Sequence, residues 1–264
     1  KGPNEILFPR LINKYNDSIF STYEVNKKEL IFFNIHEIYR RKYNFYKVLK
    51  LENLNLSLFG VIPINDSLLV LLGAFNKGKY GIYNYKTKNV SLDIDFPYDN
   101  KQKDVDNYMK GWAHQGEVSL KPDHSEIIFV YKNGYFDICR LERNKLELKK
   151  RNLYYQMEYK VFGQGVAYSK KSKYGFRSVN SSSKFIYMIY SGRSQEESGA
   201  DYFAGNNILV FDWNGNPIVN LKTNRFLQQI IVDENQKLIY GYGINQMTGE
   251  PEIVKFIIPE LCLL

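Results

Sequence analysis

The sequence predicts an all-β protein, a β-propeller of four-stranded antiparallel blades in a single domain spanning residues 1–264. Aromatic residues make up 16% of the chain, with 22 Tyr and 17 Phe, and these types favour strands. A polar turn followed by an apolar strand also recurs five times, and an aromatic strand follows each copy. Five such units fit a propeller. A β-sandwich, the main alternative, has no reason to repeat a four-strand motif five times.

The polar turn and its apolar strand define the second strand of each unit. The copies lie at residues 16–20, 65–70, 122–130, 181–187 and 233–240. Within them, residues 127–130, 185–189 and 238–240 are nearly continuous apolar runs, which are typical of strands covered on both faces. We expect these three runs to be buried between neighbouring blades.

The third strand of each unit is aromatic or β-branched, at residues 30–34, 81–85, 136–139, 208–212 and 253–256. A polar turn usually follows it, and the Asn-Gly pair within residues 213–216 is a strong hairpin signal. Fourth strands are expected at residues 90–92 and 146–148. The pattern leaves room for almost no helix.

The fifth copy stops after its third strand, near Pro259. The five residues that remain are too few for a turn and a strand of about five or six residues. Two outcomes stay open. Residues 5–8 pair with residues 253–257 and close a five-bladed ring, or upstream residues or another molecule complete a sixth blade. A fourth strand formed by residues 262–264 would contradict both.

Composition narrows the function classes. The net charge is +8, but the basic pairs are dispersed along the chain, which favours solubility rather than a nucleic-acid partner. No apolar run is long enough for a transmembrane segment. The chain opens at Lys1 without Met or a leader, which indicates a processed or trimmed product. Cys139 and Cys262 lack metal-site spacing, so we expect two unpaired thiols, with one disulfide as the alternative.

Motifs for catalysis are missing from the sequence. His36-Glu37 lacks the second His of a zinc motif, and residues 191–194 do not form a nucleophile elbow. Asp104 and Asp106 offer two carboxylates, whereas calcium needs six or more oxygen ligands. We therefore predict no catalytic residue, no cofactor and no metal site.

Three long loops are the candidate binding surface: residues 96–116, 154–175 and 191–207. In a propeller, connections between strands two and three lie on the same face as connections between blades, so all three loops should share one face. Long loops on a rigid scaffold commonly carry binding sites. The candidate ligand-binding residues on these loops are Trp112, His114, Gln115, Arg193, Glu196, Asp201 and Tyr202.

A structural explanation competes with binding for several of these residues. The structural explanation for Trp112 and His114, which we favour over binding, is that they lock a loop between two blades, with His114 satisfying backbone groups, since buried polar side chains need partners. For the charged residues Arg193, Glu196, Glu197 and Asp201, we favour a mobile, solvated loop over binding. Tyr202 and Phe203 favour contact with a sugar or a protein, because aromatic residues are enriched at interfaces.

Three segments resemble the TolB-like six-bladed propeller family. They are Gly-Pro-Asn-Glu with Phe-Pro in residues 2–9, Gly-Trp-Ala-His-Gln-Gly at 111–116 with Lys-Pro-Asp at 121–123, and the closing segment 253–261. The resemblance implies six blades, with Lys1 just after a missing first blade. It also implies a bacterial envelope protein, exported to the periplasm or cell envelope, with a possible lipid anchor at a Cys upstream of this chain. It transfers no catalytic residues.

Together these observations predict a non-catalytic binding or scaffold propeller of the bacterial cell envelope. Its long-loop face would recognise an unknown protein or glycan partner. The alternative is a calcium-dependent hydrolase or lactonase of a six-bladed type. That alternative requires acidic or Asn ligands from several blades to converge at the central channel.

Overall fold

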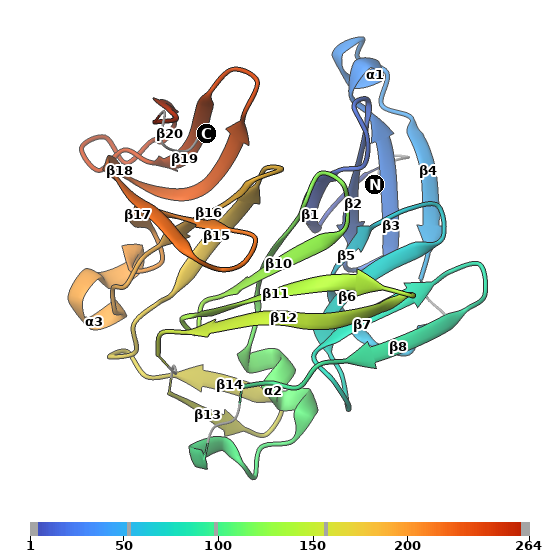
Figure 1. The fold of residues 1–264 in the computed structure, drawn as a ribbon, viewed down its shortest axis with the longest axis horizontal. Helices are drawn as coiled ribbons and strands as arrows, with labels where there is room; N and C mark the ends of the chain where they lie inside the picture. The colour runs from blue at the N-terminus through green and yellow to red at the C-terminus, as the bar shows by residue number, and fades with distance from the viewer. Residues whose placement is uncertain (1–4, 52–53, 98–99, 156–157, 260–264) are drawn as a thin grey trace. The chain divides into compact units, whose positions relative to one another are not determined.

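The computed structural model describes residues 5–51, 54–97, 100–155 and 158–259, and it is all-β (Figure 1). More than half of these residues lie in strands, and the longest helix has 7 residues. The predicted fold class and the near-absence of helix are confirmed. No helix in the described ranges is long and apolar enough to cross a membrane. The chain divides into two compact units, unit 1 (residues 1–112 and 143–146) and unit 2 (residues 113–142 and 147–264).

Unit 1 contains two four-stranded antiparallel sheets, each formed by consecutive strands. The first is β1 (Pro9–Lys14), β2 (Ile19–Glu24), β3 (Glu29–Asn34) and β4 (Phe45–Lys50), with α1 (Ile35–Tyr39) between β3 and β4. The second is β5 (Ser57–Pro63), β6 (Leu68–Ala74), β7 (Tyr80–Asn84) and β8 (Asn89–Asp93), followed by η1 (Asn100–Gln102) and α2 (Asn107–Ala113). Leu30 of the first sheet and Val61 and Leu69 of the second belong to one buried apolar cluster.

Unit 2 holds the remaining strands. One four-stranded sheet is β9 (Gly116–Leu120), β10 (Glu126–Tyr131), β11 (Tyr135–Glu142) and β12 (Lys145–Leu153), and β13 (Tyr159–Phe162) with β14 (Gly165–Tyr168) forms a hairpin. A six-stranded sheet follows: β15 (Phe176–Ser181), β16 (Phe185–Tyr190), β17 (Gly205–Asp212), β18 (Pro217–Asp233), β19 (Leu238–Ile244) and β20 (Pro251–Ile257). α3 (Gln195–Ser198) and η2 (Gly199–Asp201) lie between β16 and β17.

The long strand β18 belongs to two repeats. Its first residues pair with β17, and from Leu227 to Asp233 it pairs with β19. One strand of 17 residues is therefore the fourth strand of the fourth repeat and the first strand of the fifth. No Gly or Pro follows Pro217 within it, so the chain stays extended where a turn would otherwise separate two blades. All five predicted repeats are present, and within residues 5–259 the fifth has three strands.

A local hydrogen-bond pattern explains why the polar turn recurs. In the first two copies, Asn16 and Asn65 accept hydrogen bonds through Oδ1 from the backbone N–H groups two and three residues later, at 2.8–3.0 Å. Asp123 accepts from Ser125 N at 2.9 Å in the third copy. Asn and Asp side chains favour such turns because they mimic a backbone acceptor. The repeated residue identity therefore produces the repeated turn.

The predicted burial of the second strands is confirmed in two repeats and wrong in part in a third. Ile127–Val130 and Ile186–Ile189 are fully buried, although Phe185 is only half-buried. In β19, Ile239 is buried, whereas its neighbours Leu238 and Tyr240 are half-exposed. The apolar cluster around Ile239 covers one face of this part of the sheet. Ile253, on the partner strand β20, is 78% exposed.

The chain ends leave part of the closure prediction open. Within the described part of unit 2, β20 pairs only with β19. Residues 5–8 and 253–257 belong to different units, so their pairing stays a prediction. Residues 2–4 of the family-like opening, Cys262 and the alternative strand at residues 262–264 lie outside the described residues. Cys139 is buried within β11.

Candidate functional site

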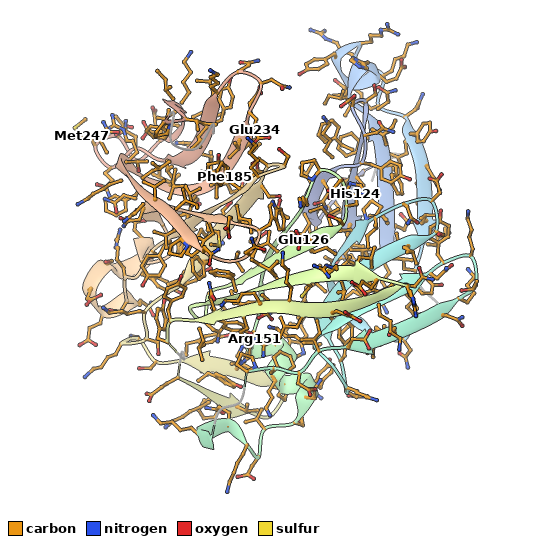
Figure 2. The ribbon with its side chains drawn as sticks, viewed as in Figure 1. His124, Glu126, Arg151, Phe185, Glu234 and Met247 are labelled. Atoms are coloured by element: carbon orange, nitrogen blue, oxygen red, sulfur yellow. The ribbon has the colours of Figure 1, made fainter. Side chains whose placement is uncertain are left out.

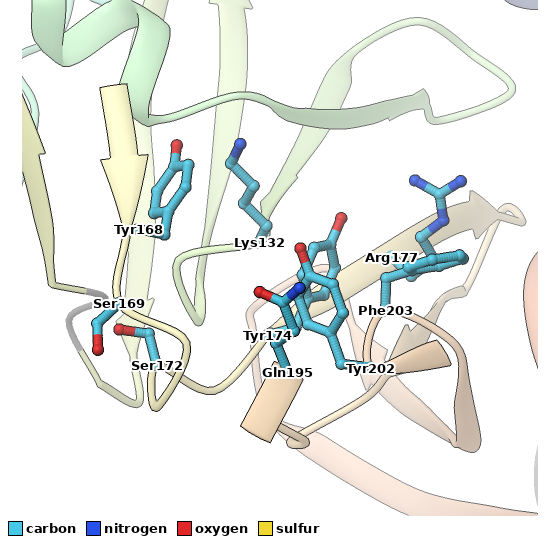
Figure 3. A pocket seen from close by; sticks show the side chains of 9 residues that line it. All are labelled: Lys132, Tyr168, Ser169, Ser172, Tyr174, Arg177, Gln195, Tyr202 and Phe203. Carbon is cyan, nitrogen blue, oxygen red and sulfur yellow. The ribbon is translucent and has the colours of Figure 1, made fainter. Parts of the chain in front are cut away.

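A cavity of about 310 Å³ in unit 2 is the candidate binding site (Figure 3). Aromatic rings form much of its wall, two cationic side chains face it, and the other polar groups are neutral. The lining residues are Lys132, Tyr168, Ser169, Ser172, Tyr174, Arg177, Gln195, Tyr202 and Phe203. None of these described lining residues is acidic. The cavity is therefore positively charged as well as aromatic.

Three connections of unit 2 converge to form the cavity. The β10–β11 turn supplies Lys132, and the β12–β15 connection, which contains the β13–β14 hairpin, supplies Tyr168 and Tyr174. The β16–β17 connection, which contains α3 and η2, supplies Gln195 and Tyr202. Two of the three long loops predicted to share a face thus meet. The remaining long loop, residues 96–116, extends over both units. Its location on the same face as the other two loops stays a prediction.

Two glycines fix the turn that presents Lys132. A Cβ on Gly175 would lie 2.5 Å from the backbone nitrogen of Gly134, far inside contact distance. The Gly175 N–H donates to the carbonyl of Lys132 at 2.6 Å. Gly134 itself has φ +80°, a conformation that glycine adopts at no steric cost. The close approach of the two backbones sets the position of Lys132.

Lys132 extends along the ring of Tyr168. Its Nζ lies 4.3 Å from the ring centroid, within cation–π range. The Tyr168 hydroxyl donates to the Ala113 carbonyl at 2.6 Å, which holds the ring in place. Burial lowers the pKa of Lys132 to about 8 and raises the pKa of Tyr168 above its ordinary value. No ion pair joins the Lys132 ammonium to a carboxylate of the described residues.

Arg177 lies over a second aromatic wall. Its Cζ is 5.2 Å from the centroid of the Phe203 ring, and its Nε is buried without a hydrogen-bond partner in the described part of the chain. Tyr202 meets both Tyr174 and Phe203 edge to face, at centroid distances of 5.5 and 5.9 Å. Burial raises the pKa of Tyr174, and the Arg177 guanidinium partly opposes that rise. Figure 3 shows this cluster across the cavity from Ser169 and Ser172.

The lining groups of the cavity suit the binding of a small polar ligand. Ring faces and edges accommodate the apolar face of a sugar or another ring, and the hydroxyl and amide groups donate and accept hydrogen bonds. The two cations attract an anionic group. Over the described ranges, no three or more His, Cys, Asp or Glu side chains are placed to hold a metal ion.

The predicted residues of the third long loop are only partly at the cavity. Tyr202 lines it. Arg193 does not: its Nε donates to Ser198 Oγ at 2.7 Å, and its Cζ lies 4.4 Å from the centroid of Phe226, so it holds the loop together. Glu196 on α3 and Asp201 on η2 are exposed. A binding role for these three charged residues stays a prediction.

The predicted residues of the first long loop lie elsewhere. In unit 1, Trp112 packs on Phe59 with centroids 4.5 Å apart. In unit 2, His114 Nδ1 lies 2.8 Å from the Tyr135 hydroxyl. Both side chains therefore have partners within their own unit, and a role in locking a loop between two blades stays a prediction. Gln115 is half-buried and does not line the cavity.

Sequence reasoning missed most of the lining. Tyr168 and Tyr174 lie in a loop already recognised as long, and their aromatic character was an available signal. Lys132 lies in a short hairpin turn and Arg177 in a strand, where a basic residue is ordinary. Only the packing of three connections distinguishes these two cations from the other basic residues of the chain.

Comparison with known proteins agrees with the fold. A family model described as TolB-like 6-blade propeller-like matches residues 1–235. The crystal structure of a functionally unknown protein from Desulfotomaculum acetoxidans DSM 771 matches at 11% identity with a TM-score of 0.47. That match covers 90% of this chain, and the chain spans 65% of the other protein's length. No curated protein is similar in sequence to this chain.

Proposed function

Because the chain belongs to the TolB-like 6-blade propeller-like family, we propose that it is a non-catalytic binding propeller that recognises a glycan through the cavity of unit 2. The observation that carries the proposal is the lining: Tyr168, Tyr174, Tyr202 and Phe203 surround the cavity together with hydroxyl and amide groups. The sequence also allows a protein partner. Such a partner would contact the same loops over a larger surface than a glycan does.

The lining chemistry supports a sugar. Aromatic side chains bury apolar area while their polar groups keep hydrogen-bonding capacity, which suits a ligand with C–H faces and many hydroxyls. The cavity volume of about 310 Å³ lies at the lower end of small-ligand sites, which span roughly 300–1,000 Å³. A site of this size accommodates one or two sugar units rather than a long chain.

The absence of acidic residues among the described lining residues favours binding over calcium-dependent chemistry at this cavity, whereas the rival function expects its ligands at the central channel. The rival, a calcium-dependent hydrolase or lactonase, needs an oxygen-rich cation site and a group that activates water. Lys132 and Arg177 at the cavity would repel a cation from it. Calcium dependence is therefore the property that separates the two functions.

Family membership also supports a place in the bacterial cell envelope, most simply the periplasm. We extend the proposal to export and to a lipid anchor on an upstream segment. Fractionation of cells that express the full-length gene product tests this location. Recovery in the cytosolic fraction would contradict it without affecting the glycan proposal.

A glycan array with the purified chain tests the binding function. We expect retention of a restricted set of glycans, with binding lost in Tyr202→Ala and Tyr174→Ala. Tyr39→Ala, which removes a ring that is 79% exposed on α1, is the matched control and should bind normally. Release of new reducing ends that requires added calcium would instead favour the hydrolase. Retention of no glycan by a folded protein would reject glycan recognition.

A further inference from the structure

The geometry points to an acidic sugar as the ligand of the unit 2 cavity, with its carboxylate or sulfate group recognised by Lys132 and Arg177. This inference rests on the proposed glycan-binding function and specifies its substrate class. Both cations come from rigid places, Lys132 from a tight turn and Arg177 from β15. Figure 3 shows both side chains on the cavity wall, each against an aromatic ring.

The first argument is the missing counter-charge. Three other basic side chains of limited exposure in unit 2 have acidic partners, and Figure 2 labels Arg151 and Glu126 from these pairs. Arg151 contacts Asp137 at 2.6 Å, and Lys121 and Lys149 contact Glu126 at 3.2 and 2.6 Å. Arg193 differs, because its contacts are with Ser198 and the Phe226 ring. Partly buried charges without partners cost free energy. Lys132 and Arg177 have no such ion pair among the described residues, so a ligand anion would compensate both.

The second argument is the aromatic setting of each cation. The Lys132 ammonium lies over Tyr168, and the Arg177 guanidinium lies over Phe203. These contacts hold the cations at the wall, and the buried Nε of Arg177 has no hydrogen-bond partner among the described residues. Arginine's planar fork matches a carboxylate or sulfate, and lysine adds a point charge. Glu117, which raises the pKa of Tyr174, lies outside the lining.

The third argument separates an acidic sugar from a simple anion. An inorganic ion needs only the cations, but this cavity also presents Ser169, Ser172 and Gln195 and the rings of three tyrosines. These groups match the hydroxyls and the ring of a sugar that carries the anion. The neutral groups thus recognise the sugar ring, and the cations recognise the acid.

The test uses pairs of oligosaccharides that differ only in charge. The probes are short uronic-acid oligosaccharides with their carboxyl-reduced forms, and sulfated oligosaccharides with their desulfated forms. Titration calorimetry with the whole chain should show acidic probes binding roughly tenfold to a hundredfold more tightly than neutral counterparts. Preference within the first pair identifies a carboxylate ligand, and preference within the second identifies a sulfate ligand.

Variants assign the effect to the two cations. Lys132→Met and Arg177→Met should each abolish the preference, whereas Lys132→Arg should keep it. Lys160→Met removes one exposed positive charge from β13 and is the control for nonspecific attraction. Thermal unfolding establishes that each variant is folded. If Lys132→Met does not fold, Lys132→Gln replaces it in the titrations.

Each contrary outcome has a distinct meaning. Equal binding of acidic and neutral probes, still dependent on Tyr202, overturns the anion inference but leaves glycan recognition intact. Lys160→Met and Lys132→Met could also weaken the preference for acidic probes equally. The preference would then come from the net charge of the protein and not from the cavity, which also overturns the inference. Binding of no probe in either charge form rejects the proposed function itself.

Discussion

The ammonium group of Lys132 lies 4.3 Å from the centre of the Tyr168 ring, and a hydrogen bond of 2.6 Å from Tyr168 to the Ala113 carbonyl fixes that ring. Three segments distant in sequence are joined by this arrangement: the β10–β11 turn, the β13–β14 hairpin and the end of α2. The ring stabilises the cation without neutralising it. The cavity therefore keeps a positive charge at a defined place.

Binding of an acidic oligosaccharide should weaken as the pH rises through about 8. Burial lowers the pKa of Lys132 to about 8, so the ammonium is charged below that pH and lost above it. Burial raises the pKa values of Tyr168 and Tyr174, so these two neighbours do not titrate in this range. Calorimetry between about pH 7 and pH 9 measures the effect.

Lys132→Arg is the matched control for this pH dependence, because arginine stays charged over the same range. It should bind the acidic probe with an affinity that is nearly constant with pH. The carboxyl-reduced probe should bind wild-type protein equally at both ends of the range. A fall in affinity of the same size in Lys132→Arg would show that another group titrates.

Tyr168→Phe should lower the free energy of unfolding by about 1 kcal/mol, the usual net value of one hydrogen bond. The change removes the hydroxyl that bonds the buried carbonyl of Ala113 and leaves that acceptor without this donor. Urea denaturation measures it. Tyr39→Phe removes an exposed hydroxyl on α1 and should be neutral. Equal stability of the two variants would mean that the Tyr168 hydroxyl does not anchor the hairpin.

Asp137→Asn should destabilise the protein by about 3–5 kcal/mol, because it breaks a buried ion pair and leaves Arg151 without its charge partner. Asp137 is completely buried, and its carboxylate accepts two hydrogen bonds from Arg151, at 2.6 and 2.8 Å. The control is Glu142→Gln, which breaks the exposed pair with Arg140 and should cost less than about 1 kcal/mol. Similar costs for the two variants, measured by denaturation, would contradict the burial of the Asp137–Arg151 pair.

Ile128→Asp should cost several kcal/mol or prevent folding, since it places an unpaired charge in a second strand with no exposure. Ile253→Asp is the matched substitution in β20, where the isoleucine is 78% exposed, and it should be nearly neutral. Thermal unfolding compares the two. Wild-type stability in Ile128→Asp would contradict the position of this strand between covered faces.

The sequence alone determined the repeat, because the repeat depends on local chemistry. Asn16, Asn65 and Asp123 each bond backbone groups within three residues, so residue type and spacing are sufficient to predict the turn. The apolar strand that follows each turn is read directly from its residue types. These features predicted the all-β class and the five repeats without reference to any distant contact.

Tertiary structure decided the rest, because burial and cavities depend on which strands and loops become neighbours. The apolar run at residues 238–240 resembles the run at 127–130, yet only the latter is fully buried. Tyr202 was predicted as a site residue from its loop, but Lys132 and Arg177 were not. Their role arises from the convergence of three connections around one cavity, and no local spacing in the sequence encodes that convergence.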